Sequence, residues 1–405
     1  MKYCLLGEKL GHSFSNYLHN LIGLDYVLTE VSKDDFDLFM RENDFDGFNV
    51  TIPYKERIIE YLDEIDSKAK SIGAINTVKK VNGKLIGYNT DYYGLKALLE
   101  KNDICLKGKN VVILGSGGAC KMSKVLAKDL GAKMIYVISR TGEYNYQNIY
   151  QIDANVIINA SPVGMYPNCG QCLVELDKFS NLSAVVDMIY NPFVTEIMFR
   201  AKENNVKAVN GMEMLVYQGV KSYEIWTGKK VDEKTCQKLI KEINLKYKNV
   251  ALVGMPSSGK TTIGEKLAKN LCKPFIDLDE EIKKQTNLSP EEIILTKGEE
   301  EFREIESKVL KEVCKTGGKV ISLGGGAVLK EENRKYILQN STVIYVKRDL
   351  EKLSAEKRPI SSRVGVQNIY KQRKHVYESI ADFEVENNKD IESAIREIEL
   401  WLKNC

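Results

Sequence analysis

Short apolar runs alternate with amphipathic stretches along most of the chain, a pattern typical of parallel sheets covered by helices. The apolar runs that we predict to be strands are residues 3–6, 26–31, 47–52, 75–81, 109–114, 134–139 and 249–253. Stretches that we predict to be helices are residues 34–43, 54–62, 121–130, 234–243 and 262–270. A polar stretch, residues 244–248, precedes the last of these strands and marks a domain boundary.

Length and composition exclude several classes of protein. At 405 residues, the chain is long enough for two or three domains, and 43% hydrophobic with 28% charged residues is typical of a soluble globular protein. No stretch approaches the roughly 18 apolar residues that span a bilayer, and the N-terminal apolar run is too short for a signal peptide. A net charge of +3 gives no support for nucleic-acid binding. We therefore expect neither a membrane nor a nucleic acid as partner.

The nine cysteines are odd in number and scattered, which favours a reducing compartment and hence the cytoplasm. Cys169 and Cys172 have the spacing of a redox motif. No second pair and no histidine with metal-ligand spacing accompanies them, so we interpret them as an incidental pair in a loop.

Residues 254–261, Gly-Met-Pro-Ser-Ser-Gly-Lys-Thr, match the phosphate-binding loop and lie between a predicted strand and a predicted helix. Glycines let backbone N–H groups converge on phosphates, and the helix N-terminus adds partial positive charge. Lys260 is then expected at the β- and γ-phosphates and the Thr261 hydroxyl on Mg²⁺. The predicted ATP contacts in this loop are Gly254, Ser257, Ser258, Gly259, Lys260, Thr261 and Thr262.

Three further motifs follow in order: Phe275-Ile-Asp-Leu-Asp279, Gly298-Glu-Glu-Glu-Phe-Arg303 and Gly324-Gly-Gly326. With the phosphate loop, they make most of residues 249–390 resemble the shikimate kinases. The resemblance implies that Asp277 serves the magnesium shell and that Asp279 is the base at the attacking shikimate hydroxyl. Two positions apart at a strand end, these carboxylates are expected to point the same way. The alternative is a pair of acids that merely caps the strand.

The same resemblance implies arginine clamps for the substrate carboxylate, because guanidinium groups bind carboxylates bidentately. Arg303 and Arg373 are the expected clamps, and Gly324, Gly325 and Gly326 let the backbone approach the substrate ring. Arg358 matches the lid arginine that closes over ATP. The lid segment before it, residues 351–357, is short and lacks a second arginine often found in that family.

A second glycine-rich turn, Gly115-Ser-Gly-Gly-Ala119, follows the predicted strand 109–114 and opens a βαβ unit of the length that a dinucleotide-binding fold requires. Cys120 stands where that pattern has a third glycine or alanine. The second strand ends in Ser139-Arg140-Thr141 rather than in an acidic residue, so a 2′-phosphate and hence NADP is favoured. The predicted NADP contacts here are Gly115, Ser116, Gly117, Gly118, Ala119, Ser139, Arg140 and Thr141.

Four motifs of the N-terminal part resemble the shikimate dehydrogenases in order and spacing, and the resemblance covers nearly all of residues 1–246. They are the segment 7–20, the segment 49–56 (Asn-Val-Thr-Ile-Pro-Tyr-Lys-Glu), Gly73-Ala-Ile-Asn-Thr77 and Gly87-Tyr-Asn-Thr-Asp91. Asn16 stands where members of that family commonly have proline. Reducing a ketone takes a hydride on carbon and a proton on oxygen, so a positioned acid is needed.

The resemblance implies that Lys55 is this acid and Asp91 its partner. The implied substrate contacts are Ser13, Ser15, Thr51, Lys55, Asn76, Asp91, Tyr190 and Gln218, with Gly211 and Met214 on the nicotinamide side. Read without the resemblance, Ser13 and Ser15 are more typical of a helix N-cap. His12 and His19 have no metal-ligand companions, and we interpret them as structural.

The predicted fold is therefore α/β throughout. A small substrate-binding domain (1–100) and a Rossmann-type NADP domain (101–246), whose last helices return to the first domain, precede a phosphate-loop kinase domain (247–405) with helices on both faces of a parallel sheet. The expected activities are reduction of 3-dehydroshikimate and phosphorylation of shikimate, with NADPH, ATP and Mg²⁺. Two alternatives stay open: a reductase that prefers quinate, and a half that has become a non-catalytic binding module. The sequence also leaves open the oligomeric state, a homo-oligomer included, and any coupling between the halves.

Overall fold

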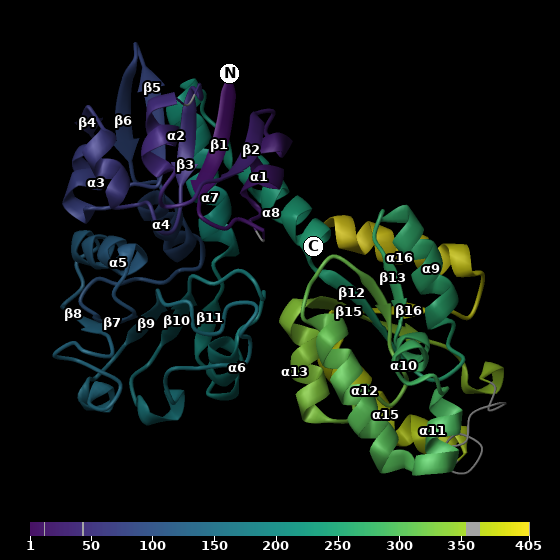
Figure 1. Ribbon diagram of the computed structural model, residues 1–405. Helices are drawn as coiled ribbons and strands as arrows, with labels where there is room; N and C mark the ends of the chain where they lie inside the picture. Colours follow the sequence, from purple (N-terminus) through teal and green to yellow (C-terminus); the bar gives the residue numbers. More distant parts are fainter. Residues whose placement is uncertain (12, 43, 354–364, 405) are drawn as a thin grey trace. The chain divides into compact units, whose positions relative to one another are not determined.

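The structure is a computed structural model that describes residues 1–11, 13–42, 44–353 and 365–404 (Figure 1). Its internal contacts divide the chain into two compact units. The first unit comprises residues Met1–Tyr190 and Thr195–Ile243, and the second comprises Asn191–Val194 and Asn244–Cys405. The first unit thus holds both domains predicted for the N-terminal part, and the division near residue 100 remains a prediction.

The first sheet of the first unit has six strands in the order β2-β1-β3-β5-β6-β4. The strands are β1 (Lys2–Gly7), β2 (Asp25–Glu30), β3 (Gly47–Val50), β4 (Glu64–Ile65), β5 (Thr77–Val81) and β6 (Lys84–Tyr88). The helices beside them are α1 (Ser15–Leu21), α2 (Phe36–Glu42), α3 (Ser67–Ile72) and α4 (Asp91–Lys101).

This first sheet is mixed, whereas the alternation of elements predicted a parallel one. Strands β3 and β5 pair antiparallel, and so do β5 and β6. The pairing of β5 with β6 follows from the dipeptide Asn82-Gly83, where both residues have positive φ (51° and 82°) and form the tight turn of a hairpin. The sequence carried this signal, but β6 was not among the predicted strands.

The prediction of a helix over residues 54–62 was wrong. The segment instead makes turns and then a 3₁₀ helix, η1 (Arg57–Tyr61). The carbonyl of Lys55 accepts the N–H of Ile75 at 2.8 Å, so it is held by a distant residue rather than by the next turn of a helix. The N–H of Ile59 reaches only as far back as the Glu56 carbonyl, the 3₁₀ spacing.

The second sheet of the first unit is parallel, in the order β11-β10-β9-β7-β8. Its strands are β7 (Asn110–Leu114), β8 (Met134–Ile138), β9 (Val156–Asn159), β10 (Ala184–Asp187) and β11 (Lys207–Val209). The helices of this part are α5 (Gly118–Asp129), α6 (Glu196–Glu203), α7 (Met212–Thr227) and α8 (Glu233–Tyr247), with short 3₁₀ helices η2 (Ile149–Gln151) and η3 (Leu176–Lys178).

The apolar run of β7 is buried on both faces. Val111 and Ile113 pack into one hydrophobic cluster, and Val112 and Leu114 into another. The strand order reverses at β7, which has β8 on one side and β9 on the other, and ligands of such sheets bind at the carboxyl ends of the strands at this point. Helix α7 packs against α4 and α1, so it joins this sheet to the first.

The second unit contains one parallel sheet in the order β13-β14-β12-β15-β16. Its strands are β12 (Asn249–Val253), β13 (Phe275–Asp277), β14 (Val320–Ser322), β15 (Ser341–Lys347) and β16 (Phe383–Glu386). Its helices are α9 (Lys260–Asn270), α10 (Leu278–Thr286), α11 (Pro290–Lys297), α12 (Glu299–Cys314), α13 (Glu331–Asn340), α15 (Val366–Ile380) and α16 (Ile391–Asn404), with the 3₁₀ helix η4 (Leu350–Lys352).

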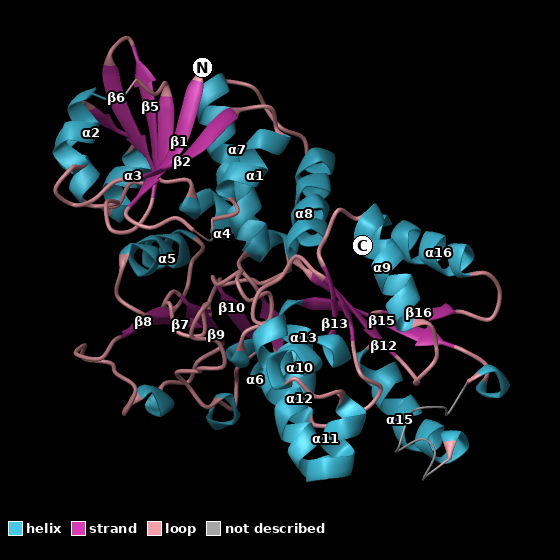
Figure 2. Cartoon of the chain, turned by 45° about the vertical axis from the view of Figure 1, so that its right-hand side comes forward, coloured by secondary structure: helices cyan, strands magenta, loops and turns pink. Residues whose placement is uncertain are grey.

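Helices cover both faces of this sheet, as predicted (Figure 2). Ala251 and Val253 of β12 pack toward α10, α12 and α13, whereas Val250 and Leu252 pack toward α9 and α16. Helix α11 begins at a capping box, in which Ser289 and Glu292 satisfy each other's backbone N–H groups. Within the described ranges, no helix has the length and apolar character to cross a membrane.

Candidate active sites

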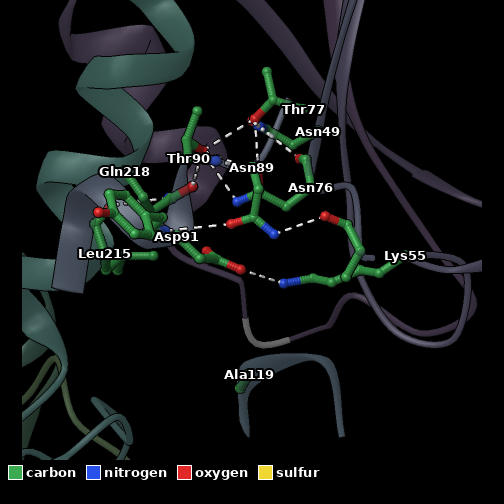
Figure 3. Close-up of polar contacts among 12 residues, drawn as sticks. Asn49, Lys55, Asn76, Thr77, Asn89, Thr90, Asp91, Ala119, Leu215 and Gln218 are labelled. Atoms are coloured by element: carbon green, nitrogen blue, oxygen red, sulfur yellow. Dashed lines mark hydrogen bonds and ion pairs between the residues drawn. The ribbon is translucent and has the colours of Figure 1, made fainter. Parts of the chain in front are cut away.

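In the first unit, the ammonium of Lys55 and the carboxylate of Asp91 point toward one another (Figure 3). Lys55 Nζ donates to Asp91 Oδ2 at 2.5 Å, and the side chains are 22% and 15% exposed. Lys55 comes from the turn after β3, and Asp91 is the first residue of α4. The structure thus brings together two residues 36 positions apart, in a partly buried place.

A buried polar network lies beside this pair and fixes the segments that carry it. Asn49 donates to the Oγ1 of Thr77 and to the Oγ of Ser222, each at 3.0 Å. Asn76 accepts the N–H of Thr90 at 2.6 Å and donates to its hydroxyl at 3.0 Å. Because Thr90 is the residue before Asp91, this exchange sets the start of α4. Asn49, Thr90 and Ser222 are functional candidates that the motifs did not single out.

Gln218, a predicted substrate contact, belongs to the same network. Its Nε2 donates to the Leu215 carbonyl at 2.9 Å, and its Oε1 accepts from Thr90 Oγ1 at 3.4 Å (Figure 3). Gln218 is therefore held by α7 on one side and by the α4 N-terminus on the other. Thr51 lies in the turn after β3, where its carbonyl accepts the N–H of Tyr54.

The predicted substrate loop ends at Ser15, the first residue of α1. Ser13 Oγ accepts the N–H of Ser15 at 3.2 Å, and the N-cap residue of α1 is Phe14, whose side chain makes no capping bond. The Phe14 ring lies 5.2 Å from the Tyr190 ring, centroid to centroid. Tyr190, predicted to close the cleft, therefore meets this loop.

Of the two histidines predicted to be structural, the structure describes one. His19 is fully buried in α1, with its ring stacked on that of Tyr26 at 4.2 Å. His12 lies outside the described residues.

The glycine-rich turn after β7 is built to receive an anion. Gly115 has φ of +111°, and a Cβ there would lie 3.1 Å from the carbonyl oxygen of Ala160 in the loop after β9. Gly117 is the N-cap of α5 and supplies no capping side chain, so the first N–H groups of the helix are left to a ligand. Ser116 and Gly117 are exposed, and Gly118 and Ala119 are the first residues of α5.

The remaining predicted cofactor contacts lie at the ends of β8 and at the start of α7. Ser139, Arg140 and Thr141 follow β8 directly, with the Arg140 and Thr141 side chains exposed. Gly211 is the N-cap of α7, and its N–H donates to the Ile189 carbonyl at 3.0 Å. Met214 lies in the first turn of α7 and packs against the cluster that contains α4 and α5.

Two buried polar residues at the carboxyl ends of β9 and β10 were not singled out from the sequence. Asn159 ends β9 and Asp187 ends β10, and Asn159 Nδ2 donates to Asp187 Oδ1 at 3.0 Å. Burial raises the pKa of Asp187 to about 6. The available signal was positional, since polar residues at the ends of neighbouring parallel strands gather at the ligand edge of such sheets.

In the second unit, the loop from Gly254 to Thr261 has the backbone that phosphate binding requires. Gly254, Ser257 and Gly259 have positive φ (145°, 64° and 96°), which curls the loop around a central point. Lys260 is buried, and its Nζ donates to the carbonyls of Gly254 and Met255 at 3.1 and 2.9 Å. Ser258 is buried and Thr262 exposed.

The oxygen ligands expected around magnesium lie together. Thr261 Oγ1 donates to Asp277 Oδ2 at 2.8 Å, and Asp277 Oδ1 accepts the N–H groups of Asp279 and Glu280 as the N-cap of α10. Asp279 is thus a helical residue, so the strand spacing from which the two carboxylates were expected to point the same way does not extend to it. The strand ends at Asp277 because its side chain starts the helix.

The three predicted glycines gather the predicted shikimate residues. A Cβ at Gly324 would lie 3.1 Å from Asp279 Oδ1, and one at Gly325 would lie 3.2 Å from an Arg373 terminal nitrogen. A Cβ at Gly326 would overlap the Arg303 guanidinium. A side chain would therefore crowd its neighbours at Gly324 and Gly325 and overlap Arg303 at Gly326, and Asp279, Arg303 and Arg373 converge on one stretch of backbone.

Two buried residues complete this cluster and were not predicted. Glu306 accepts from Arg303 Nη1 at 2.6 Å, and burial raises its pKa although Arg303 opposes this. Tyr377 donates to the Gly325 carbonyl at 2.5 Å, and burial raises its pKa to about 12. Their signals were local, because they lie three residues after Arg303 and four after Arg373 on the same helix faces. The predicted lid arginine, Arg358, lies outside the described residues.

Comparison with protein-family models supports the two halves separately. Residues 5–78 match the model "Shikimate dehydrogenase substrate binding domain", and residues 211–241 match "Shikimate 5'-dehydrogenase C-terminal domain". Residues 256–403 match the model "Shikimate kinase".

Curated and solved relatives cover the N-terminal part. Shikimate dehydrogenase (NADP(+)) of Clostridium beijerinckii is 39% identical over 258 residues, 58% of this chain and 96% of that protein. The shikimate dehydrogenase (NADP(+)) of Methanococcus maripaludis is 38% identical, over 58% of this chain and 95% of the relative. A crystal structure of a chorismate mutase/shikimate 5-dehydrogenase fusion from Clostridium acetobutylicum has 40% identity and a TM-score of 0.57, covering 60% of this chain and 96% of that one.

Proposed function

Since the chain belongs to the shikimate dehydrogenase family and carries a shikimate kinase domain after it, we propose that its two units catalyse consecutive reactions. The first unit reduces 3-dehydroshikimate to shikimate with NADPH, and the second phosphorylates shikimate on its 3-hydroxyl with ATP. One observation carries this proposal. Each unit combines a glycine-rich turn for phosphate groups with charged side chains suited to a hydroxylated carboxylic acid.

In the reduction, nicotinamide supplies the hydride when NADPH is bound. Lys55 donates the proton to the ketone oxygen, and its ammonium is aimed by the 2.5 Å contact with Asp91. Asp91 also accepts from a substrate hydroxyl, so that the ring is held at two neighbouring oxygens. The network of Asn76, Thr90 and Gln218 keeps these groups in place, which lowers the reorganisation needed during the reaction.

The substrate carboxylate is bound by the hydroxyls of Ser13 and Ser15 in this proposal. Arg140 follows β8, where an NAD enzyme would place an acidic residue to bind the ribose hydroxyls, and this supports NADP rather than NAD. The curated relatives named as NADP enzymes support it too. The N-terminus of α5 and the turn at Gly115 receive the pyrophosphate.

In the phosphorylation, Asp279 takes the proton of the 3-hydroxyl as its oxygen attacks the γ-phosphorus. Lys260 exchanges its two carbonyl partners for phosphate oxygens and neutralises the charge on the transferred group. Arg303 and Arg373 hold the shikimate carboxylate, and Glu306 fixes the direction of the Arg303 guanidinium. Arg358 is proposed to close over ATP.

The oxygens of Thr261 and Asp277 fit a magnesium ion carried in with ATP. Both are hard oxygen donors, and the 2.8 Å contact between them places them at one point beside the phosphate loop. Such an ion completes its shell with phosphate oxygens and water, so the protein need supply only one or two ligands. We also propose a cytoplasmic location, because all eight described cysteines are free thiols.

The direct test supplies the purified full-length chain with 3-dehydroshikimate, NADPH, ATP and magnesium. Loss of NADPH absorbance together with a new phosphorus resonance of shikimate 3-phosphate is the expected result. With ATP omitted, shikimate should accumulate instead. Replacing NADPH by NADH, and shikimate by quinate in the reverse reaction, decides the cofactor and the substrate. Turnover of quinate above that of shikimate would reassign the reductase.

Two single substitutions test the assignment of each site. Lys55→Ala should abolish reduction and leave phosphorylation, and Lys260→Ala should do the reverse. Lys121→Ala and Lys266→Ala are matched controls, because both remove an exposed lysine from an ion pair of the same unit, with Glu56 and with Glu392. If Lys55→Ala or Lys260→Ala leaves its own reaction intact, that half uses other residues for catalysis. A half that is only a binding module would show no reaction even in the wild-type chain.

A further inference from the structure

Asp187 is a buried carboxylate for which the proposed reactions have no use. It ends β10 and has no exposed surface. Its Oδ1 accepts Asn159 Nδ2 at 3.0 Å and the N–H of Ile189 at 3.1 Å, and its Oδ2 accepts the Thr195 hydroxyl at 2.5 Å. Among the described residues no cation pairs with it. A buried charge supported only by neutral donors is costly, so the site calls for an explanation.

Two of the three bonds of Asp187 fasten a loop at both ends. Ile189 is near the start of the segment that follows β10, and Thr195 is the N-cap of α6, where that segment ends. Thr195 is itself buried. With one carboxylate oxygen on each end, the residues between them cannot shift along the strand without breaking a bond.

This loop carries the Tyr190 ring, which lies 5.2 Å from Phe14 of the substrate loop. The Ile189 carbonyl accepts the N–H of Gly211 at 3.0 Å, at the point where α7 begins. A Cβ at Gly211 would overlap the Met188 carbonyl, so the two backbones are in direct contact. The position of the loop therefore determines both the aromatic contact and the start of the helix that carries Gln218.

Asp187 is also linked to the dinucleotide turn. The Nδ2 of Asn159 donates to Asp187, and its Oδ1 accepts the Ser161 hydroxyl at 2.7 Å. Ala160, between them, is the residue whose carbonyl faces Gly115. The carboxylate thus stands where three segments of the reductase site meet: the loop after β9, the loop after β10 and the start of α7.

We propose that Asp187 is a positioning residue of the reductase, which holds the loop after β10 so that Tyr190 packs against the substrate loop. This inference rests on the proposed reductase function and adds a residue to it. Asp187 touches no substrate in this account and acts through Tyr190. Its three acceptor contacts require a carboxylate, or an amide of the same shape as a partial replacement.

A merely structural role makes a different prediction. If Asp187 only stabilised the fold, its loss would lower the fraction of folded chain and leave each folded molecule fully active. If it positions Tyr190, then removing Tyr190 first should leave Asp187 with nothing to position. A double-mutant cycle in kcat/KM separates these cases.

The experiment compares full-length wild type, Asp187→Ala, Tyr190→Ala and the double variant in reduction of 3-dehydroshikimate. Each preparation is normalised by circular dichroism and checked by its kinase activity. Asp187→Ala should lower kcat/KM roughly tenfold to a hundredfold, as expected when reacting groups are displaced by about 1 Å. The double variant should be no slower than the slower single variant. Effects that multiply would overturn the inference.

Two further variants keep the test sharp if Asp187→Ala fails to fold. Thr195→Val removes only the bond to Oδ2 and enters the same cycle with Tyr190→Ala. Asp187→Asn retains an acceptor for Asn159 and Ile189 and should restore kcat to within about threefold of wild type. Asp177→Ala, an exposed acid of the same unit, is the control and should change nothing. A wild-type chain that does not reduce 3-dehydroshikimate would refute the proposed function itself, whereas an active wild type with multiplying effects refutes only the role of Asp187.

Discussion

His19 should make the first unit sensitive to mild acid, and the variant His19→Phe should remove that sensitivity. The ring is fully buried, stacks on Tyr26 and lies 5.4 Å from the Trp226 ring. Neither ring nitrogen has a partner at full hydrogen-bond geometry among the described residues, and Asn49 beside the ring opposes the effect of burial only in part. Burial lowers the pKa of His19 from its ordinary 6.5 to about 3. Phenylalanine keeps the stacked ring and has no nitrogen to protonate.

The sign and size follow from proton linkage. Below a pH of about 6.5 the unfolded chain binds a proton at this histidine, but the folded chain does not until about pH 3. The unfolding free energy therefore falls as the pH is lowered through this window. At pH 5 the loss from this one group is about 2 kcal/mol relative to pH 7.5, and at pH 5.5 it is about 1.4 kcal/mol.

Urea unfolding at the two pH values measures this loss. Trp226 belongs to the first unit and Trp401 to the second, so a Trp401→Phe background makes fluorescence report the first unit alone. The free-energy difference between His19→Phe and its parent should shift by about 2 kcal/mol in favour of the variant between pH 7.5 and pH 5. His375→Phe, at an exposed position of the second unit, is the control. Parallel pH dependence of the variant and its parent would refute the reasoning.

Two further predictions concern backbone contacts and the kinase cluster. Gly211→Ala places a methyl group on the Met188 carbonyl and should cost the first unit about 1–3 kcal/mol, and Gly317→Ala does the same to the second unit at the Tyr247 carbonyl. Thermal unfolding should therefore show one transition lowered in each variant, and a lowered transition in the other unit would contradict the assignment. Tyr377→Phe removes the donor to the partly buried Gly325 carbonyl, so the kinase KM for shikimate should rise more than the KM for ATP. Equal changes in both constants would show that the contact does not serve the shikimate side.

The parallel parts of the fold could be predicted because their signals are local. The strand 249–253 was predicted with the bounds that the structure has, since a buried parallel strand is a continuous apolar run followed by a glycine turn. The 3₁₀ helix at residues 57–61 could not be predicted, because the Lys55 carbonyl accepts the N–H of Ile75, twenty positions away. Local spacing carries no information about such a bond.

The candidate sites show the same division between local and distant information. Lys260 and Thr261 are neighbours in a motif, so their joint role was visible in the sequence. Asn49 and Ser222 are 173 positions apart and meet only because α7 packs back on the first sheet. The role of Asp187 was hidden for another reason, since a lone aspartate at a strand end has no distinguishing neighbour until the loop after it is folded.

The charged side chains assigned to each reaction have their closest partners in their own unit, and this has a consequence for how the two activities depend on each other. Lys55, Asp91 and Gln218 belong to the first unit, and Asp279 and Arg303 belong to the second. Lys55 pairs with Asp91, Gln218 with Thr90 and Arg303 with Glu306, each within one unit. The chemical competence of each half is then set by the folding of that half. A substitution that unfolds the first unit should stop the overall conversion of 3-dehydroshikimate but not the phosphorylation of added shikimate.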